Sequence, residues 1–235
     1  MTHPRWSAPG PYEIVFTTRV GGVSQGDYAS LNLGRKTGDE VERVDENRRR
    51  ACAEIGADAE RLALNYQVHS ATVLRARAGA RGDRADGLWT DEPDLPLLAM
   101  GADCLPIAIV RANGDVPAVA VVHAGWRGLL AGIVESAVAA LGGDRLAAAV
   151  GPGIGPCCYE VRGDVAVPYR DRFGTRIVDA GRLDLWRAAE ESLHGAGVQR
   201  VERLDTCTAC APELFFSHRR DGKPHGVQGV LARVA

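Results

Sequence analysis

The chain has 235 residues, of which 46% are hydrophobic and 25% are charged, and these values are typical of a folded protein with a packed core. The formal net charge of -2 excludes the strongly basic surface with which proteins bind nucleic acids or anionic membranes. A chain of this length also fits one domain, so we expect residues 1–235 to form a single unit.

The N-terminal stretch MTHPRWSAPG lacks the apolar segment of a signal peptide, and the longest apolar runs, such as 117–122, are too short to cross a bilayer. We therefore expect a cytoplasmic protein with no membrane partner. In that compartment the six cysteines are expected to be mostly reduced, which leaves them for metal binding, catalysis or core packing.

Short strands and helices are interspersed along the chain. β-Branched and aromatic residues before a Gly–Gly turn predict a strand over 12–19. Short apolar runs predict buried strands over 96–100, 106–110, 117–122 and 145–150. Length and apolar content predict helices over 39–55, 128–141 and 184–194, and the Gly- and charge-rich stretch 79–87 is typical of a surface loop. This mixture indicates an α/β or α+β domain.

The first of these helices has a recognisable start and two distinct faces. Asp39 is placed to cap its N-terminus, and Val41, Val44 and Ala51 mark its inner side. The basic run Arg48–Arg50 is expected on its solvated face.

Three polar residues, His69, Cys104 and His123, each follow an apolar run of the sequence. Two imidazoles and one thiolate suit zinc and leave a fourth position open, as in catalytic zinc sites. Asp103, beside Cys104, is a candidate general base or hydrogen-bond acceptor for such a site. The spacing matches no local zinc-finger pattern. The residues alone therefore leave open a metal-free mechanism, in which Cys104 is a nucleophile and His123 is its base.

Other candidate site residues lie in loops and at element ends. Arg127 follows a predicted strand at the start of a predicted helix, where a guanidinium favours phosphate or carboxylate. Arg19 and Asn32 lie in polar, Gly-rich loops and are candidates for contacting substrate, although ordinary turn formation explains them equally well. Gln67, close to His69, is a further candidate substrate-binding residue.

The remaining cysteines lie mostly in the C-terminal half. Cys157 and Cys158 follow a Gly/Pro-rich loop, and because the side chains of neighbouring cysteines diverge they do not readily bridge each other. We expect one of them to line the pocket and the other to pack in the core, and Cys158 is the candidate substrate-binding residue. Cys207 and Cys210 have the CxxC spacing of zinc and redox sites, but this single pair has no second pair of the same spacing.

Six segments, in order, make the chain resemble the YfiH/LACC1 family, also called the multicopper polyphenol oxidase, laccase-like or DUF152 family. They are TTRVGGVSQGDYASLNLG (17–34), NYQVHSATV (65–73), ADGLW (85–89), GADCLPI (101–107), VVHAGWRGL (121–129) and GPGIGPCCYEV (151–161). FFSHRRDG (215–222) fits as well, but the arginine expected near the next glycine is missing from HGVQGV (225–230).

The resemblance implies a layered α/β/β/α sandwich with mixed sheets, similar to a bacterial toxin deamidase, and a single catalytic domain. It implies zinc on His69, Cys104 and His123. The implied activities are phosphorolysis of adenosine, inosine and methylthioadenosine and deamination of adenosine, so that purine nucleosides and phosphate are the expected partners. Some bacterial members are implicated in editing peptidoglycan precursors.

Several further functions stay open at this point. A four-copper oxidase needs roughly ten histidine ligands, whereas this chain has six histidines in total. We therefore expect the copper-oxidase name to be wrong for the physiological reaction, although copper could bind the same residues adventitiously. A metal-free Cys–His amidase acting on peptidoglycan precursors and a non-enzymatic metal-binding module are also compatible with the residues. The sequence does not distinguish a monomer from a homodimer.

Overall fold

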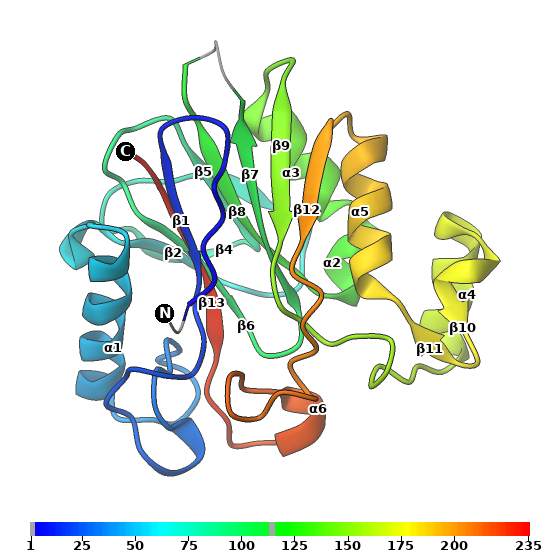
Figure 1. Ribbon diagram of the computed structural model, residues 1–235, viewed down its shortest axis with the longest axis horizontal. Helices are drawn as coiled ribbons and strands as arrows, with labels where there is room; N and C mark the ends of the chain where they lie inside the picture. The colour runs from blue at the N-terminus through cyan, green and yellow to red at the C-terminus, as the bar shows by residue number, and fades with distance from the viewer. Residues whose placement is uncertain (1–2, 113–115) are drawn as a thin grey trace.

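The computed structural model describes residues 3–112 and 116–235, and its centre consists of two mixed β-sheets that pack face to face (Figure 1). The five-stranded sheet has the order β1 (Tyr12–Phe16), β13 (Gln228–Val234), β6 (Leu97–Gly101), β2 (Ala63–Tyr66) and β4 (Arg81–Arg84). The six-stranded sheet has the order β12 (Arg200–Arg203), β9 (Leu146–Val150), β7 (Leu105–Arg111), β8 (Val119–Ala124), β5 (Gly87–Thr90) and β3 (Val73–Arg75).

The continuous apolar runs of the sequence form strands that are buried on both faces. In β7, Ile107 and Ile109 pack toward the helices, whereas Ala108 and Val110 pack toward the other sheet. Side chains alternate between the two faces of a strand, so an unbroken apolar run is what a strand between two packed layers requires.

Helices cover the outer faces of both sheets (Figure 1). Helix α1 (Val41–Glu54) packs on the five-stranded sheet. The six-stranded sheet carries α2 (Trp126–Ala131), α3 (Ile133–Leu141) and α5 (Leu185–Gly195), with α4 (Gly163–Phe173) beside them. The remaining elements are the hairpin β10 (Val178–Asp179) and β11 (Arg182–Leu183), the short helix α6 (His218–Asp221), and 3-10 turns at Gly26–Tyr28, Ala59–Arg61 and Thr175–Ile177. The predicted α/β/β/α sandwich is confirmed.

No helix among the described residues has the length and apolar character needed to cross a membrane.

Two expected boundaries are corrected by the structure. The helix predicted over 128–141 is two helices, because Gly132 adopts φ 88° and ends α2 with a left-handed cap. The stretch 79–87 is more than a loop, since it contains β4, which pairs in parallel with β2. All four residues of β4 are exposed, and its polar, charged composition suits the edge of a sheet.

The start of α1 also differs from the prediction. The cap residue is Glu40, whose side chain makes no capping hydrogen bond. Asp39 instead accepts hydrogen bonds from Ser24 Oγ at 2.6 Å, from Asn32 Nδ2 at 2.9 Å and from the backbone N–H of Glu40 at 2.9 Å. Its carboxylate thus ties the 24–32 loop to the helix instead of closing the first turn.

The faces of α1 agree with the sequence only in part. Val44 and Ala51 are buried as predicted, but Val41 is 45% exposed because it lies at the first helical position, beyond the edge of the core. Arg48 is 4% exposed, not solvated, and its Nε donates to the carbonyl of Leu33 at 2.8 Å. This burial lowers its pKa to about 10. The next two arginines pair with a surface glutamate.

Candidate metal centre and its cavity

His69, Cys104 and His123 are brought together where the chain passes between the two sheets. His69 follows β2, Cys104 lies in the turn from β6 into β7, and His123 lies in β8 beside the start of β7. One ligand atom from each residue lies within 4.8 Å of the other two. The imidazole rings are edge to face with their centroids 4.8 Å apart, and Cys104 Sγ lies 3.9 Å from His69 Nε2.

The carboxylate of Asp86 contacts both histidines. Asp86 is 1% exposed and lies immediately before β5. One carboxylate oxygen lies 2.9 Å from His123 Nδ1 and accepts the backbone N–H of His69 at 2.9 Å. The other oxygen accepts the backbone N–H and the hydroxyl of Ser70, at 2.6 and 2.8 Å. A carboxylate on Nδ1 leaves Nε2 of His123 for a ligand, which is how metal-bound histidines are usually oriented.

The charges within the group support one another. Burial disfavours the Cys104 thiolate, but the charge of protonated His123 and hydrogen bonds from both imidazoles outweigh it and lower the pKa to about 6. Burial likewise disfavours protonated His123, but the Cys104 thiolate and Asp86 raise its pKa to about 9. Burial raises the pKa of Asp86, and the larger combined effect of His123 and Ser70 holds it well below its usual range. A thiolate is the form of cysteine that binds metals.

The backbone around the group is shaped to leave it room. A Cβ on Gly125 would lie 2.8 Å from Cys104 Sγ and 3.0 Å from His69 Cδ2, so a side chain there would fill the space between these two residues. His69 and Asp103 have φ of 61° and 86°, in the left-handed region that non-glycine residues rarely adopt. Such backbone conformations cluster at functional sites.

The donor set and its setting fit one metal ion. Three ligands from separate strand ends, one of them a thiolate, leave a coordination position toward the cavity, which is the pattern of catalytic zinc sites. The carboxylate on His123 and the glycine beside the sulfur supply the orientation and the space that such an ion requires.

The three residues open into a cavity of about 880 Å³. Its described lining contains a single carboxylate, Asp103. The Lys and Arg residues that line it are Arg35, Lys36, Arg48, Arg81, Arg127, Arg219 and Lys223. A cavity with this excess of positive charge attracts anions such as phosphate.

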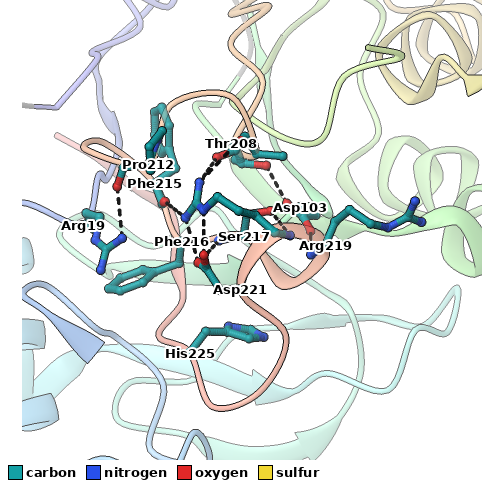
Figure 2. Close-up of polar contacts among 12 residues, drawn as sticks. Arg19, Asp103, Thr208, Pro212, Phe215, Phe216, Ser217, Arg219, Asp221 and His225 are labelled. Carbon is teal, nitrogen blue, oxygen red and sulfur yellow. Dashed lines mark hydrogen bonds and ion pairs between the residues drawn. The ribbon is translucent and has the colours of Figure 1, made fainter. Parts of the chain in front are cut away.

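Asp103 lines the cavity, and hydrogen bonds hold its carboxylate in place (Figure 2). Its carboxylate accepts a hydrogen bond from Thr208 Oγ1 at 2.6 Å and from the backbone N–H of Arg219 at 2.7 Å. The residue is 8% exposed, and both partners come from the C-terminal part of the chain. Each carboxylate oxygen keeps one lone pair for another partner. Asp103 therefore faces the cavity, whereas the carboxylate that orients the histidines is Asp86.

Arg127 and Gln67 also line the cavity. The guanidinium of Arg127 lies 4.3 Å from the centroid of the Trp126 ring, so it stacks on an aromatic face at the start of α2. Gln67 is engaged with the backbone of Met100, accepting from its N–H at 2.8 Å and donating to its carbonyl at 2.5 Å. The Gln67 side chain thus links the segment before His69 to β6.

Three other predicted substrate residues have local contacts and lie outside this lining. Arg19 donates to the carbonyl of Pro212 (Figure 2) and also to the carbonyl of Ala29. Asn32 is completely buried, and its Oδ1 accepts from the backbone N–H of Gly34 at 3.0 Å. Cys158 lies with three other cysteines. A direct role for these three in substrate binding stays a prediction.

Asp86 and the cationic wall formed by Arg219 and Lys223 are not predictable from local sequence patterns. The signal for Asp86 is an Asp–Gly pair before an aromatic, β-prone segment, a pattern that ordinary turns also have. The cationic residues of the cavity wall come from segments far apart in the chain, so no local sequence pattern predicts that they lie together.

Comparison with known proteins gives a consistent result along the whole chain. The family model described as multi-copper polyphenol oxidoreductase laccase matches residues 13–234. The purine nucleoside phosphorylase PA4543 of Pseudomonas aeruginosa is 38% identical over 234 residues, covering 94% of this chain and 93% of the relative. The purine nucleoside phosphorylase YfiH of Escherichia coli is 35% identical over 227 residues, covering 93% and 92%.

Among solved structures, the chain is similar to Neisseria meningitidis protein NMB0706, of family model DUF152. The TM-score is 0.91 at 34% identity, with 100% of this chain and 99% of that chain covered. The structure of YlmD from Geobacillus stearothermophilus has a TM-score of 0.87 at 32% identity, with 100% and 97% covered. The sequence motifs, the sandwich and these likenesses agree, and the chain belongs to the YfiH/LACC1 family of laccase-like, DUF152 proteins.

Proposed function

We propose that this protein is a zinc-dependent purine nucleoside enzyme that phosphorolyses adenosine, inosine and methylthioadenosine and also deaminates adenosine. The observation that carries the proposal is the position of the His69–Cys104–His123 group in a cavity whose charged lining is almost entirely cationic. Such a cavity accommodates a nucleoside together with inorganic phosphate. Relatives named purine nucleoside phosphorylase, similar over more than nine tenths of the chain, support the same substrates.

We assign the phosphate to Arg127. Its guanidinium lies over the Trp126 ring and borders the same cavity as His123. A guanidinium can hold two phosphate oxygens at once. In phosphorolysis a phosphate oxygen bonds to C1′ of the ribose as the bond from C1′ to the purine nitrogen breaks. The products are ribose 1-phosphate and a purine that takes up one proton.

We assign proton transfer to Asp103. It is the one carboxylate in the described cavity lining, and Thr208 and Arg219 fix its direction. In deamination, water adds to C6 of adenosine and ammonia leaves, and a carboxylate carries the proton between the two. A zinc ion on the three ligands supplies Lewis-acid chemistry and makes water nucleophilic at neutral pH.

We favour zinc over copper in spite of the laccase description of the family model. Among the described residues, the His-containing group that could hold a metal consists of His69, Cys104 and His123 alone. His218 and His225 form a separate pair on the cavity wall, with His218 Nδ1 3.1 Å from His225 Nε2. This arrangement lacks the cluster of histidines that a blue and a trinuclear copper centre require.

A metal-free hydrolase is the second candidate, and one observation favours it. Cys104, His123 and Asp86 form a thiol–imidazole–carboxylate series, and Cys104 has a pKa of about 6. Cysteine amidases use the same three groups as nucleophile, base and orienting residue. The substrate of such a hydrolase is an amide such as a peptidoglycan precursor.

Removal of metal separates the two candidates. Purified protein is incubated with adenosine and phosphate before and after dialysis against a chelator, and the purines are resolved by chromatography. The zinc enzyme loses turnover on chelation and recovers it when zinc is added back. Undiminished turnover of adenosine in protein shown to be metal-free would remove the zinc proposal, whereas no turnover of adenosine before or after chelation would favour the cysteine hydrolase.

A further inference from the structure

A second group of metal-binding side chains lies apart from the centre described above. Cys157 and Cys158 follow the Gly/Pro-rich loop after β9, and Cys207 and Cys210 follow β12. One sulfur from each of the four lies within 4.8 Å of all the others. The fold thus brings together two cysteine pairs separated by about fifty residues, which the sequence shows only as two unrelated pairs.

The spacing of these sulfurs matches one tetrahedral ion. Cys210 Sγ lies 3.6 Å from Cys157 Sγ and 3.4 Å from Cys158 Sγ. A zinc–sulfur distance of about 2.3 Å in a tetrahedron places neighbouring sulfurs about 3.8 Å apart. A disulfide needs about 2.05 Å, and all four cysteines are free. An iron–sulfur cluster has several irons, each with its own thiolates, and therefore spreads its cysteines more widely than one ion does.

A backbone amide also donates a hydrogen bond to one of these sulfurs, which stabilises its thiolate form. The backbone N–H of Gly155 donates to Cys207 Sγ at 3.3 Å. Hydrogen bonds of this kind stabilise a thiolate and fix its orientation in metal sites. Cys157 and Cys210 are exposed, so an ion can enter from solvent.

We propose that Cys157, Cys158, Cys207 and Cys210 bind one structural zinc ion, in addition to the ion held by the histidines. Four thiolates complete a tetrahedral shell and leave no position for substrate, which is the pattern of structural zinc. Two zinc ions per chain are then expected, with different ligands and different roles.

An ion at this position would also affect the cavity, because the cysteines adjoin the segments that contact Asp103. Gly153 and Cys207 form a parallel β-bridge, and the backbone N–H of Thr208 donates to the carbonyl of Gly153 at 3.0 Å. Thr208 in turn donates to Asp103, and Ile154 donates its N–H to the carbonyl of Asp103 at 2.8 Å. The four cysteines therefore clamp the two segments that hold Asp103 in place.

The test is the zinc content of full-length protein purified under reducing conditions without chelator. Wild type is expected to contain two zinc ions per chain. The double variant C157A/C210A changes two exposed side chains, and we expect it to fold and to contain one. His69→Ala is also expected to contain one, having lost the other ion. The matched control Cys52→Ala removes a buried cysteine outside both groups and is expected to keep two.

The unfolding temperature supplies a second readout that does not depend on activity. Chelation is expected to lower it in wild type and in His69→Ala, and to have a much smaller effect in His69→Ala combined with C157A/C210A. Equal zinc content in C157A/C210A and wild type would overturn the proposal. So would iron in place of zinc, or an intact mass showing a disulfide among these four cysteines in the reduced preparation.

Discussion

Replacement of Asp86 by Asn tests the orientation of the metal ligands with almost no change in shape. The carboxylate receives donors from the backbone N–H groups of residues 68–70, from the Ser70 hydroxyl and from the His123 ring. An Asn side chain has a single acceptor oxygen, so its amide NH₂ group takes the place of the other carboxylate oxygen and faces the Ser70 donors. The Ser70 hydroxyl can rotate and accept a hydrogen bond from this NH₂ group. The backbone N–H of Ser70 cannot accept, so one buried donor is left unpaired.

Such a donor costs about 1–3 kcal/mol, and hydrogen bonds to a charged group contribute about 1.5–3 kcal/mol each. We therefore expect Asp86→Asn to lower the free energy of unfolding by about 2–4 kcal/mol. Loss of the partner that orients a metal-bound histidine typically lowers metal affinity ~10–100-fold. Chemical denaturation measures the first effect, and competition with a chromogenic zinc chelator measures the second.

The control for this variant is Asp83→Asn, in the same segment. Asp83 is exposed, and its carboxylate lies 3.3 Å from the guanidinium of Arg77. Exposed ion pairs contribute little, so we expect stability and zinc affinity within error of wild type. Zinc affinity in Asp86→Asn equal to that of the control would refute the reasoning that Asp86 orients His123.

Three other substitutions separate the parts of the site. Gly125→Ala places a Cβ 2.8 Å from Cys104 Sγ, so we expect weaker zinc binding in a folded chain; unchanged affinity would show that the space is not needed. Arg127→Ala is expected to raise the KM for phosphate at least ~10-fold without loss of zinc; the exposed Arg176→Ala is its control, and an unchanged KM would remove Arg127 from the phosphate site. Asp103→Asn is expected to slow deamination ~10²–10⁴-fold; inosine formation at the wild-type rate would exclude Asp103 as the proton carrier.

The candidate metal ligands could be selected from the sequence because polar groups at strand ends converge in a folded sheet, and the family resemblance then favoured a metal over a metal-free Cys–His pair. His69, Cys104 and His123 each follow an apolar run, and the structure places them within reach of one ion. The prediction of a layered sandwich came from the family resemblance. Periodicity could not supply it, because strands such as β7 are apolar on both faces and show no alternation.

What the sequence could not show depends on contacts between distant segments. Strand β13 pairs antiparallel with β1, with Tyr12 opposite Val234, and nothing local to either segment specifies that partner. Asp86 forms hydrogen bonds with His69, which follows β2, and with His123 of β8. The residues next to Asp86 in the chain show only an ordinary turn pattern. Arg48 looks like part of a solvated basic run and is buried because the loop carrying Leu33 folds over it.

In the proposed function, one zinc-dependent site converts purine nucleosides by two routes. The most direct test of this proposal is the product analysis of adenosine incubated with the zinc-loaded protein, with and without inorganic phosphate. With phosphate, adenine is expected to form, and ribose 1-phosphate is expected to equal the sum of adenine and hypoxanthine, because inosine made by deamination is phosphorolysed as well. Without phosphate, adenine is expected to be absent and inosine to form. Adenine released equally well without phosphate, or neither adenine nor inosine under any condition, would contradict the account.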